Sequence, residues 1–306
     1  MSAFDRLIVA LRREMGDRVR TNVYLRDHTT YRVGGPASVL VEIEVLSDLE
    51  FLSRAMAEEG GIGVLPLGRG SNLVVADGGF RGVVVRLGPR FASLSGEGTS
   101  LVAGAAAPMP QVANRAARRG LAGMEFAIAI PGSIGGGVRM NAGAHGGEVA
   151  DHLTTAMVFH LPSGELMERA AASLELSYRR STLSDEEIVV AARWELPEDE
   201  PDEIKRRTEA NRKHRAETQP GAVQNAGSVF KNPPGDHAGR LVEAAELKGF
   251  AVGGARVSEL HANFFIAGQG ATARDVHELV RQVRARVYET FGVELETEIR
   301  FVGRFE

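Results

Sequence analysis

The chain contains no cysteine. This absence excludes disulfides, cysteine-ligated zinc, cysteine-ligated iron–sulfur clusters and any cofactor attached through a cysteine. None of the eight histidines forms an H-x-H or H-E-x-x-H pattern, so we expect no metal site. The sequence also lacks an uncharged apolar run of about 18 residues, which argues against a membrane span.

A strong charge of either sign is missing as well. The formal net charge is −4, which gives no reason to expect nucleic acid or a membrane surface as a partner. The first 15 residues carry several charged side chains, among them Asp5, Arg12 and Arg13, and have no signal-peptide apolar region. We therefore expect a cytoplasmic protein, and we take a monomer as the expected state.

The length of 306 residues, with 43% hydrophobic and 25% charged residues, indicates two globular domains. The composition changes where the acidic segment 196–203 gives way to the basic helical segment 205–215. We place the domain boundary here and expect domains at 1–196 and 197–306. A basic run of this kind is also typical of a solvated helix face.

Apolar periodicity predicts the regular elements. The N-terminal segment is an amphipathic helix with Phe4, Leu7 and Leu11 on one face. Ser47 and Glu50 form an expected capping box for a second helix, and Thr272 and Asp275 cap a later one. Further predicted elements are a helix at 110–120, strands at 38–44, 64–67, 82–88, 154–160 and 187–194, and a loop and strand at 292–302.

Two glycine-dense segments, 67–73 (LGRGSNL) and 130–137 (IPGSIGGG), are the clearest ligand signals. Glycines allow main-chain N–H groups to close around an anion, and two such loops suit a diphosphate cofactor. Leu73 replaces the third glycine of a Rossmann fingerprint, and no G-K-[ST] follows, so neither a Rossmann motif nor a P-loop is present. Two unrelated tight turns remain the alternative. We expect the wider segment 123–147 to be an ordered loop system without a regular helix or central strand.

Eight short motifs occur in a specific order along the chain. They are 29–37 (TTYRVGGPA), 67–73, 130–137, 140–143 (MNAG), 178–181 (YRRS), 227–233 (GSVFKNP), 258–264 (SELHANF) and 296–303 (ETEIRFVG). In this order of motifs the sequence resembles the UDP-N-acetylenolpyruvoylglucosamine reductase (MurB) family, from about Thr21 to the C-terminus.

The resemblance implies an α+β fold. A two-part FAD-binding domain of the vanillyl-alcohol-oxidase (PCMH) type would be followed by a smaller α+β substrate-binding domain. It implies non-covalent FAD, NADPH as hydride donor, and a small-molecule UDP-sugar as partner. The implied reaction reduces UDP-N-acetylglucosamine enolpyruvate to UDP-N-acetylmuramate in peptidoglycan precursor synthesis. Residues lining FAD would be Gly68, Arg69, Gly70, Ser71, Asn72, Leu73, Pro131, Gly132, Ser133, Gly135, Gly136, Asn141 and Gly143.

Three residues match the family's catalytic positions. Ser228 matches the proton donor, Arg179 the catalytic arginine, and Glu298 the catalytic glutamate. Ser228 lacks the G-x-S-x-G elbow of a nucleophile, and without the resemblance it would be interpreted as a turn serine. Arg179 alone would be interpreted as a surface ion pair. Glu298 either orients the substrate or, if protonated, donates to the enolate. In a strand, Glu296 would face the same side.

The resemblance also suggests substrate contacts, at Lys231, Asn232 and Asn263. The UDP diphosphate needs cations, for which Arg212, Lys213 and Arg215 are candidates. His261 is expected to be a satisfied buried histidine. The sequence departs from the family pattern at Ala129, Gly137 and Thr297, and the segment 181–226 is short, as in the subtype without a tyrosine-bearing lid.

Two alternatives stay open at this point. The chain could be another FAD-dependent oxidoreductase of the same superfamily, acting on a different substrate. It could also be a flavin-binding protein without turnover.

Overall fold

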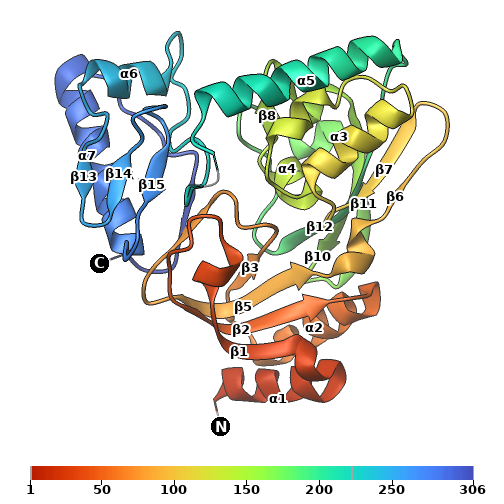
Figure 1. The fold of residues 1–306 in the computed structure, drawn as a ribbon. Helices are drawn as coiled ribbons and strands as arrows, with labels where there is room; N and C mark the ends of the chain where they lie inside the picture. The colour runs from red at the N-terminus through yellow and green to blue at the C-terminus, as the bar shows by residue number, and fades with distance from the viewer. Residues whose placement is uncertain (1, 222, 306) are drawn as a thin grey trace. The chain divides into compact units, whose positions relative to one another are not determined.

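The computed structural model describes residues 2–221 and 223–305 (Figure 1). The chain divides into two compact units that interleave along the sequence. Unit 1 comprises Met1–Thr21, Val39–Gly68 and Gly82–Lys213, and unit 2 comprises Asn22–Ser38, Arg69–Arg81 and His214–Glu306. Both units combine helices with strands, so the predicted α+β class is confirmed.

Unit 1 begins with helix α1 (Ala3–Met15), which was predicted from its apolar face. The Ser2 hydroxyl accepts from the Asp5 N–H at 3.1 Å, and Asp5 accepts from the Ser2 N–H at 2.9 Å, which forms a capping box. Leu7 and Leu11 are buried, and α1 packs on α2 (Leu46–Glu59). The hydrophobic period therefore identified both the helix and its buried face.

The predicted capping box of α2 was wrong. The helix begins at Leu46, before Ser47, and the Asp48 carboxylate accepts from the Glu44 N–H at 2.8 Å and the Val45 N–H at 3.1 Å. Arg18 donates to the same carboxylate. Asp48 thus caps the start of α2 in place of Ser47, and Arg18 pairs with its carboxylate.

Two sheets, each with its own hydrophobic core, form the frame of unit 1. Neighbouring strands of the second sheet pair antiparallel, whereas the first sheet contains a parallel pair. The first sheet has the order β1 (Val19–Tyr24), β2 (Pro36–Ile43), β5 (Phe80–Leu87), β3 (Val64–Pro66). The second has the order β11 (Glu165–Ala170), β10 (Leu153–His160), β12 (Glu187–Glu195), β7 (Ser100–Gly104), β6 (Leu94–Ser95). All five predicted strands and the helix α3 (Met109–Arg118) are present.

The segment 123–147 is ordered, as predicted, but the expectation that it holds no regular helix was wrong. Helix α4 (Ile134–Arg139) includes three consecutive glycines. A Cβ at Gly137 would lie 2.9 Å from the Met109 sulfur, and one at Gly135 would lie 3.1 Å from the Ala105 Cβ. Close packing against α3 and the end of β7 therefore outweighs the low helix propensity of glycine. Short strands β8 (Gly143–Ala144) and β9 (Gly147–Glu148) follow.

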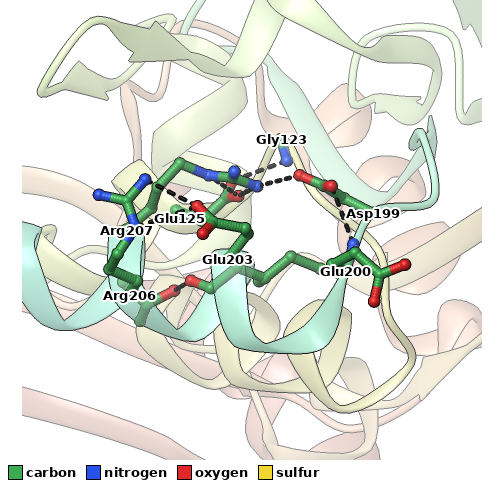
Figure 2. A network of polar contacts seen from close by, with 9 residues as sticks. Gly123, Glu125, Asp199, Glu200, Glu203, Arg206 and Arg207 are labelled. Carbon is green, nitrogen blue, oxygen red and sulfur yellow. Dashed lines mark hydrogen bonds and ion pairs between the residues drawn. The ribbon is translucent and has the colours of Figure 1, made fainter.

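Helix α5 (Pro201–Thr218) contains the predicted basic run, and an ion network anchors its first half within unit 1 (Figure 2). The Arg207 guanidinium lies 2.8 Å from the Glu125 carboxylate and 2.6 Å from that of Asp199. Glu125 in turn accepts from the Gly123 N–H at 2.7 Å. This part of the basic face is therefore paired with carboxylates and does not simply face solvent.

Unit 2 centres on helix α7 (Ala273–Phe291), whose predicted capping box of Thr272 and Asp275 is confirmed at 3.1 Å. Val276, Leu279 and Val283 are fully buried against the sheet of β13 (Ala251–Val252), β14 (Ala255–Val257) and β15 (Phe265–Ala267). Helix α6 (Ala238–Ala244) contributes to the same core.

The N-terminal pieces of unit 2 join it through strand pairing. Strand β4 (Leu73–Val75) lies parallel to β16 (Arg300–Val302), the strand predicted near the C-terminus. Tyr31 and Val74 enter the same hydrophobic core as α7. The sequence predicted two consecutive domains with one boundary after residue 196, whereas each compact unit consists of three separate segments of the chain.

Within the two described ranges, no helix is long and apolar enough to cross a membrane. The same residues contain no cluster of three or more acidic or histidine side chains that could hold a metal ion.

Candidate active site

The first glycine loop follows β3, and at Gly70 it packs against the backbone of residues 28–30. Gly70 has a φ of +62°, and a Cβ there would lie 2.2 Å from the His28 carbonyl oxygen. The Thr30 N–H donates to the Gly70 carbonyl at 3.1 Å. Only glycine fits this position, because a side chain would require both a strained φ and a movement of the 28–30 backbone.

Thr29 lies beside this loop and was quoted in the sequence only as part of a motif. Its hydroxyl is buried and has no hydrogen-bond partner within the described part of the chain. A buried hydroxyl is normally paired, so an unpaired one beside a glycine loop fits a ligand with oxygen acceptors. Threonine in a loop carries too weak a sequence signal to be singled out for this role.

The second glycine loop is fixed to the chain that leads from β7 into α3. The Met109 N–H donates to the Gly132 carbonyl at 3.0 Å, and the Ile134 N–H donates to the Ala107 carbonyl at 2.9 Å. Ser133 is the N-cap residue of α4 and is 3% exposed. Pro131 and Gly136 are exposed at the two ends of this loop.

The two loops meet inside unit 1. A Cβ at Gly68 would lie 2.4 Å from the Ser133 hydroxyl oxygen. Gly68 therefore allows the main chain of the first loop to approach the second more closely than any other residue would. This contact fits the expectation that both loops hold one cofactor with a diphosphate.

Two residues of the first loop are already bound to their own unit. The Asn72 side-chain N–H donates to the Glu298 carbonyl at 3.0 Å, and the Asn72 carbonyl accepts from the Arg300 N–H at 2.9 Å. Leu73 is buried in β4. Arg69 is exposed and Ser71 is half-buried, so their side chains are the more accessible ones of this segment.

Arg179 lies at the tip of a tight turn. Ser177 and Arg180 exchange main-chain hydrogen bonds of 3.1 and 3.0 Å, and Arg179 between them has a φ of +56°. A left-handed conformation in a non-glycine residue costs about 1 kcal/mol or more. The turn thus holds Arg179 in a specific conformation, although it does not lie at the end of a strand.

Arg179, Asn141 and Gly143 come together in unit 1. The Arg179 guanidinium donates to the Gly143 carbonyl at 2.6 Å and lies 4.8 Å from the Tyr178 ring centre. Asn141 is fully buried; its side chain donates to the Ser177 carbonyl at 3.1 Å and accepts from the Ala150 N–H at 3.0 Å. Asn141 therefore connects the predicted cofactor segment to the turn that carries Arg179.

In unit 2, Ser228 and Glu298 lie on hydrogen-bonded segments. Ser228 pairs with Phe264 in an isolated β-bridge, and the Glu298 N–H donates to the Val229 carbonyl at 2.8 Å. Both Ser228 and Glu298 are half-buried. The structure thus brings these two predicted catalytic residues to adjacent segments.

The local backbone gives Glu296 and Glu298 different surroundings. The chain bends at Glu298, so strand alternation does not apply. The Glu296 side chain is 76% exposed and lies 3.1 Å from the Lys231 ammonium. Glu298 is the more enclosed of the two carboxylates.

The remaining predicted substrate residues differ in their surroundings. The Asn232 side chain accepts from the Ala238 N–H at 3.0 Å, whereas Asn263 is buried with 4% exposure. Arg212 is exposed on α5. Arg215 is half-buried, and burial lowers the pKa of its guanidinium without an offsetting carboxylate among the described residues.

His261 is half-buried rather than buried. Its Nδ1 accepts from the Asn263 N–H at 3.2 Å, and burial is the main cause that lowers the pKa of the imidazole. Both observations indicate a neutral ring with its proton on Nε2.

Comparison with known proteins gives one consistent result. The model of the C-terminal domain of UDP-N-acetylenolpyruvoylglucosamine reductase matches residues 219–302, and an FAD-binding domain model matches residues 37–169. The chain is 45% identical over 292 residues to UDP-N-acetylenolpyruvoylglucosamine reductase 2 of Symbiobacterium thermophilum, covering 94% of this chain and 92% of that protein.

Two further proteins agree. The UDP-N-acetylenolpyruvoylglucosamine reductase of Halalkalibacterium halodurans is 39% identical, over 98% of this chain and 99% of its own length. The crystal structure of UDP-N-acetylenolpyruvylglucosamine reductase (MurB) from Thermus caldophilus superposes with a TM-score of 0.82 at 38% identity, covering 94% of this chain and 99% of that one. The FAD-binding fold of the PCMH type and FAD as cofactor are thereby established for this chain.

Proposed function

The chain belongs to the UDP-N-acetylenolpyruvoylglucosamine reductase family, and we propose that it reduces UDP-N-acetylglucosamine enolpyruvate to UDP-N-acetylmuramate with NADPH as the source of electrons. Family membership makes it an oxidoreductase of peptidoglycan synthesis. The observation that carries the finer proposal is the pairing of the Ser228 and Glu298 segments through the Val229 carbonyl.

The residues present fit FAD. Gly68 and Gly70 leave no room for side chains, and the Thr29 hydroxyl is buried without a partner among the described residues. The two glycine loops would hold the diphosphate with main-chain N–H groups and with Ser71 and Ser133. When bound, FAD would supply the hydride-transfer chemistry, with NADPH as the source of the hydride.

Arg179 would stabilise the negative charge that develops on the substrate during the reaction. A guanidinium forms a planar fork that matches a carboxylate, and it stays charged throughout the reaction. Its contact with the Gly143 carbonyl and its left-handed backbone fix its direction before the substrate arrives. Such preorganised charge stabilises an enolate at little reorganisation cost.

Ser228 would supply the proton. A serine hydroxyl is a very weak acid, so it can protonate only a strongly basic carbon held within hydrogen-bond reach. The enolate of a lactyl ether is such a base. Gly227 precedes Ser228 with a φ of +76°, so the chain turns directly before the hydroxyl.

Glu298 would orient the bound substrate. Its main chain is held from two sides, because the Glu298 carbonyl accepts from Asn72 and its N–H donates to Val229. The side chain thus starts from a fixed backbone.

Lys231, Asn232, Arg212 and Arg215 complete the proposed substrate contacts. Among the candidate cations, Arg215 would be stabilised most by a bound diphosphate, since no carboxylate in the described part of the chain offsets the burial of its charge. Arg212 is exposed and would contribute mainly long-range attraction.

We also propose a functional division in which 1–196 bind FAD and 197–306 bind the UDP-sugar. The expected compartment is the cytoplasm, and the expected state is a monomer. Light scattering of the FAD-loaded protein tests the latter.

The test separates the two half-reactions. Under anaerobic conditions, NADPH should bleach the flavin absorbance, and the enolpyruvyl UDP-sugar should restore it. Ser228→Ala should leave bleaching intact and slow the restoration by roughly 10²–10⁴-fold. Ser228→Cys, which keeps a proton donor in a chain without other thiols, should recover part of that rate.

Other outcomes identify the alternatives. Bleaching without restoration by the UDP-sugar would indicate a flavin oxidoreductase with another substrate. A flavin that NADPH does not bleach would indicate a binding protein without turnover. Normal restoration in Ser228→Ala would remove the serine from the mechanism.

A further inference from the structure

The Asn263 side chain forms hydrogen bonds to the Phe230 main chain of the kind that a neighbouring strand would form. It is 4% exposed, its Oδ1 accepts from the Phe230 N–H at 2.9 Å, and its Nδ2 donates to the Phe230 carbonyl at 2.8 Å. An amide side chain carries the same acceptor and donor as a peptide group. One residue thus satisfies both main-chain polar groups of a buried residue 33 positions away in the sequence.

The main chain of Asn263 adds a third bond to the same segment. Its carbonyl accepts from the Val229 N–H at 2.8 Å. Val229 and Phe230 are buried, with 0% and 1% exposure, so water cannot replace these bonds. Asn263 therefore fixes the two residues that directly follow Ser228.

The residue before Ser228 provides much less constraint. Gly227 has a φ of +76° and no side chain, and its N–H donates to the half-buried Asn225 at 2.9 Å. On the opposite edge of the segment 228–231, the Glu298 N–H donates to the Val229 carbonyl and the Lys231 N–H donates to the Glu296 carbonyl. Asn263 is thus the side-chain anchor on one edge, opposite the edge that carries Glu298.

We infer that Asn263 is a positioning residue that holds the Ser228 hydroxyl within reach of the substrate, acting through the Val229–Phe230 backbone rather than by touching the substrate. The inference rests on the proposed function. Its Oδ1 and one N–H of its Nδ2 are engaged with Phe230 and the residue is only 4% exposed, so the amide is directed at the chain itself. Since a displacement of about 1 Å can slow a reaction by roughly 10²-fold, the anchor has a kinetic consequence.

The variants are Asn263→Ala and the milder Asn263→Asp, both measured as FAD-loaded protein. Aspartate keeps an acceptor for the Phe230 N–H but loses the donor and brings an anionic oxygen to the Phe230 carbonyl. Flavin bleaching by NADPH should stay within about twofold of wild type. Restoration by the enolpyruvyl UDP-sugar should slow by roughly 10–100-fold, with a larger solvent deuterium isotope effect as proton transfer becomes limiting.

A double variant and a stability control make the test specific. In a Ser228→Ala background, Asn263→Asp should cause no further slowing, because the group that it positions is gone. Thr272→Ala removes the cap of α7 in the same unit without touching the segment, and both half-reactions should stay at the wild-type rate.

The outcomes separate this inference from the proposed function. Wild-type protein that the UDP-sugar fails to reoxidise would refute the proposed function. If wild type is reoxidised and Asn263→Asp matches it in rate and isotope effect, the inference fails. Equal slowing of both half-reactions, further slowing in the Ser228→Ala background, or the same effect from Thr272→Ala would reduce Asn263 to a structural role and also overturn the inference.

Discussion

Replacing Gly68 by alanine should weaken FAD binding, and removing the Ser133 hydroxyl should reverse the part of this loss that the steric clash causes. A Cβ at residue 68 would lie 2.4 Å from the Ser133 oxygen, about 1 Å inside ordinary contact. Ser133 is 3% exposed, so its side chain cannot swing into solvent. The two loops would have to separate or strain.

The magnitude follows from the cost of overpacking. Inserting a methyl group into a close-packed site costs about 1–3 kcal/mol. If the loops hold FAD together, the dissociation constant should rise by roughly 5–150-fold, since 1.4 kcal/mol is tenfold. In the double variant, the nearest atom would be the residue 133 Cβ at 3.6 Å, an ordinary contact. The double variant should then bind FAD as Ser133→Ala alone does.

Titration of apoprotein with FAD, followed by flavin fluorescence, measures all four dissociation constants. Thermal unfolding of the apoproteins serves as the control for folding. The shared-contact reasoning is refuted if Gly68→Ala binds FAD like wild type. It is equally refuted if the losses of the two single variants simply add in the double variant.

Two further predictions concern other positions. Outside its own helix backbone, a Cβ at Gly136 would have the Ser133 hydroxyl oxygen at 3.7 Å as its nearest contact among the described residues. Gly136→Ala should therefore stabilise apoprotein α4 by about 0.5–1 kcal/mol and still weaken FAD binding roughly tenfold. An unchanged FAD titration would remove Gly136 from the site. Burial by itself raises the pKa of Asp48, but hydrogen bonds from Arg18 and from the N–H groups of Glu44 and Val45 outweigh it and hold that pKa below 3.8. The stability that Asp48 contributes is therefore present above pH 3.8 and lost as the pH falls through its folded value. Asp48→Asn should cost about 1–2 kcal/mol at pH 7 in urea unfolding, and a difference from wild type that stays constant down to pH 2 would contradict this.

Local sequence signals predicted local structure well. Helix α7 was predicted from its Thr272–Asp275 box and apolar face, because a cap and a period act within a few residues. Helix α4 was missed because its glycines oppose helix formation locally. Contacts with Ala105 and Met109, which lie outside the segment, decide its conformation.

The interleaving of the two compact units along the chain could not be predicted from the sequence, for a related reason. Strand β4 pairs with β16, and no feature of residues 73–75 names a partner more than 200 positions away. The acidic-to-basic change near residue 200 marks helix α5 rather than a clean division between compact units.

The resemblance identified the candidate catalytic residues, but it did not predict the contacts that hold them in place. The resemblance implied cofactor contacts for Asn72 and Asn141 and a substrate contact for Asn263. In the structure their side chains bond main-chain groups of the Glu298, Ser177 and Phe230 residues. Sequence alone does not distinguish these tasks, because an amide offers the same donor and acceptor to a ligand as to a distant peptide.

The pairing of β4 with β16 also has a consequence for synthesis in the cell. Residues 69–81 leave the ribosome early, yet their strand partner at Arg300–Val302 is made much later. A growing chain folds from its N-terminal side, so the segment that follows Gly68 must wait, with its strand edge open, for most of translation. Chaperone demand and aggregation during expression should therefore centre on this early, unpartnered stretch.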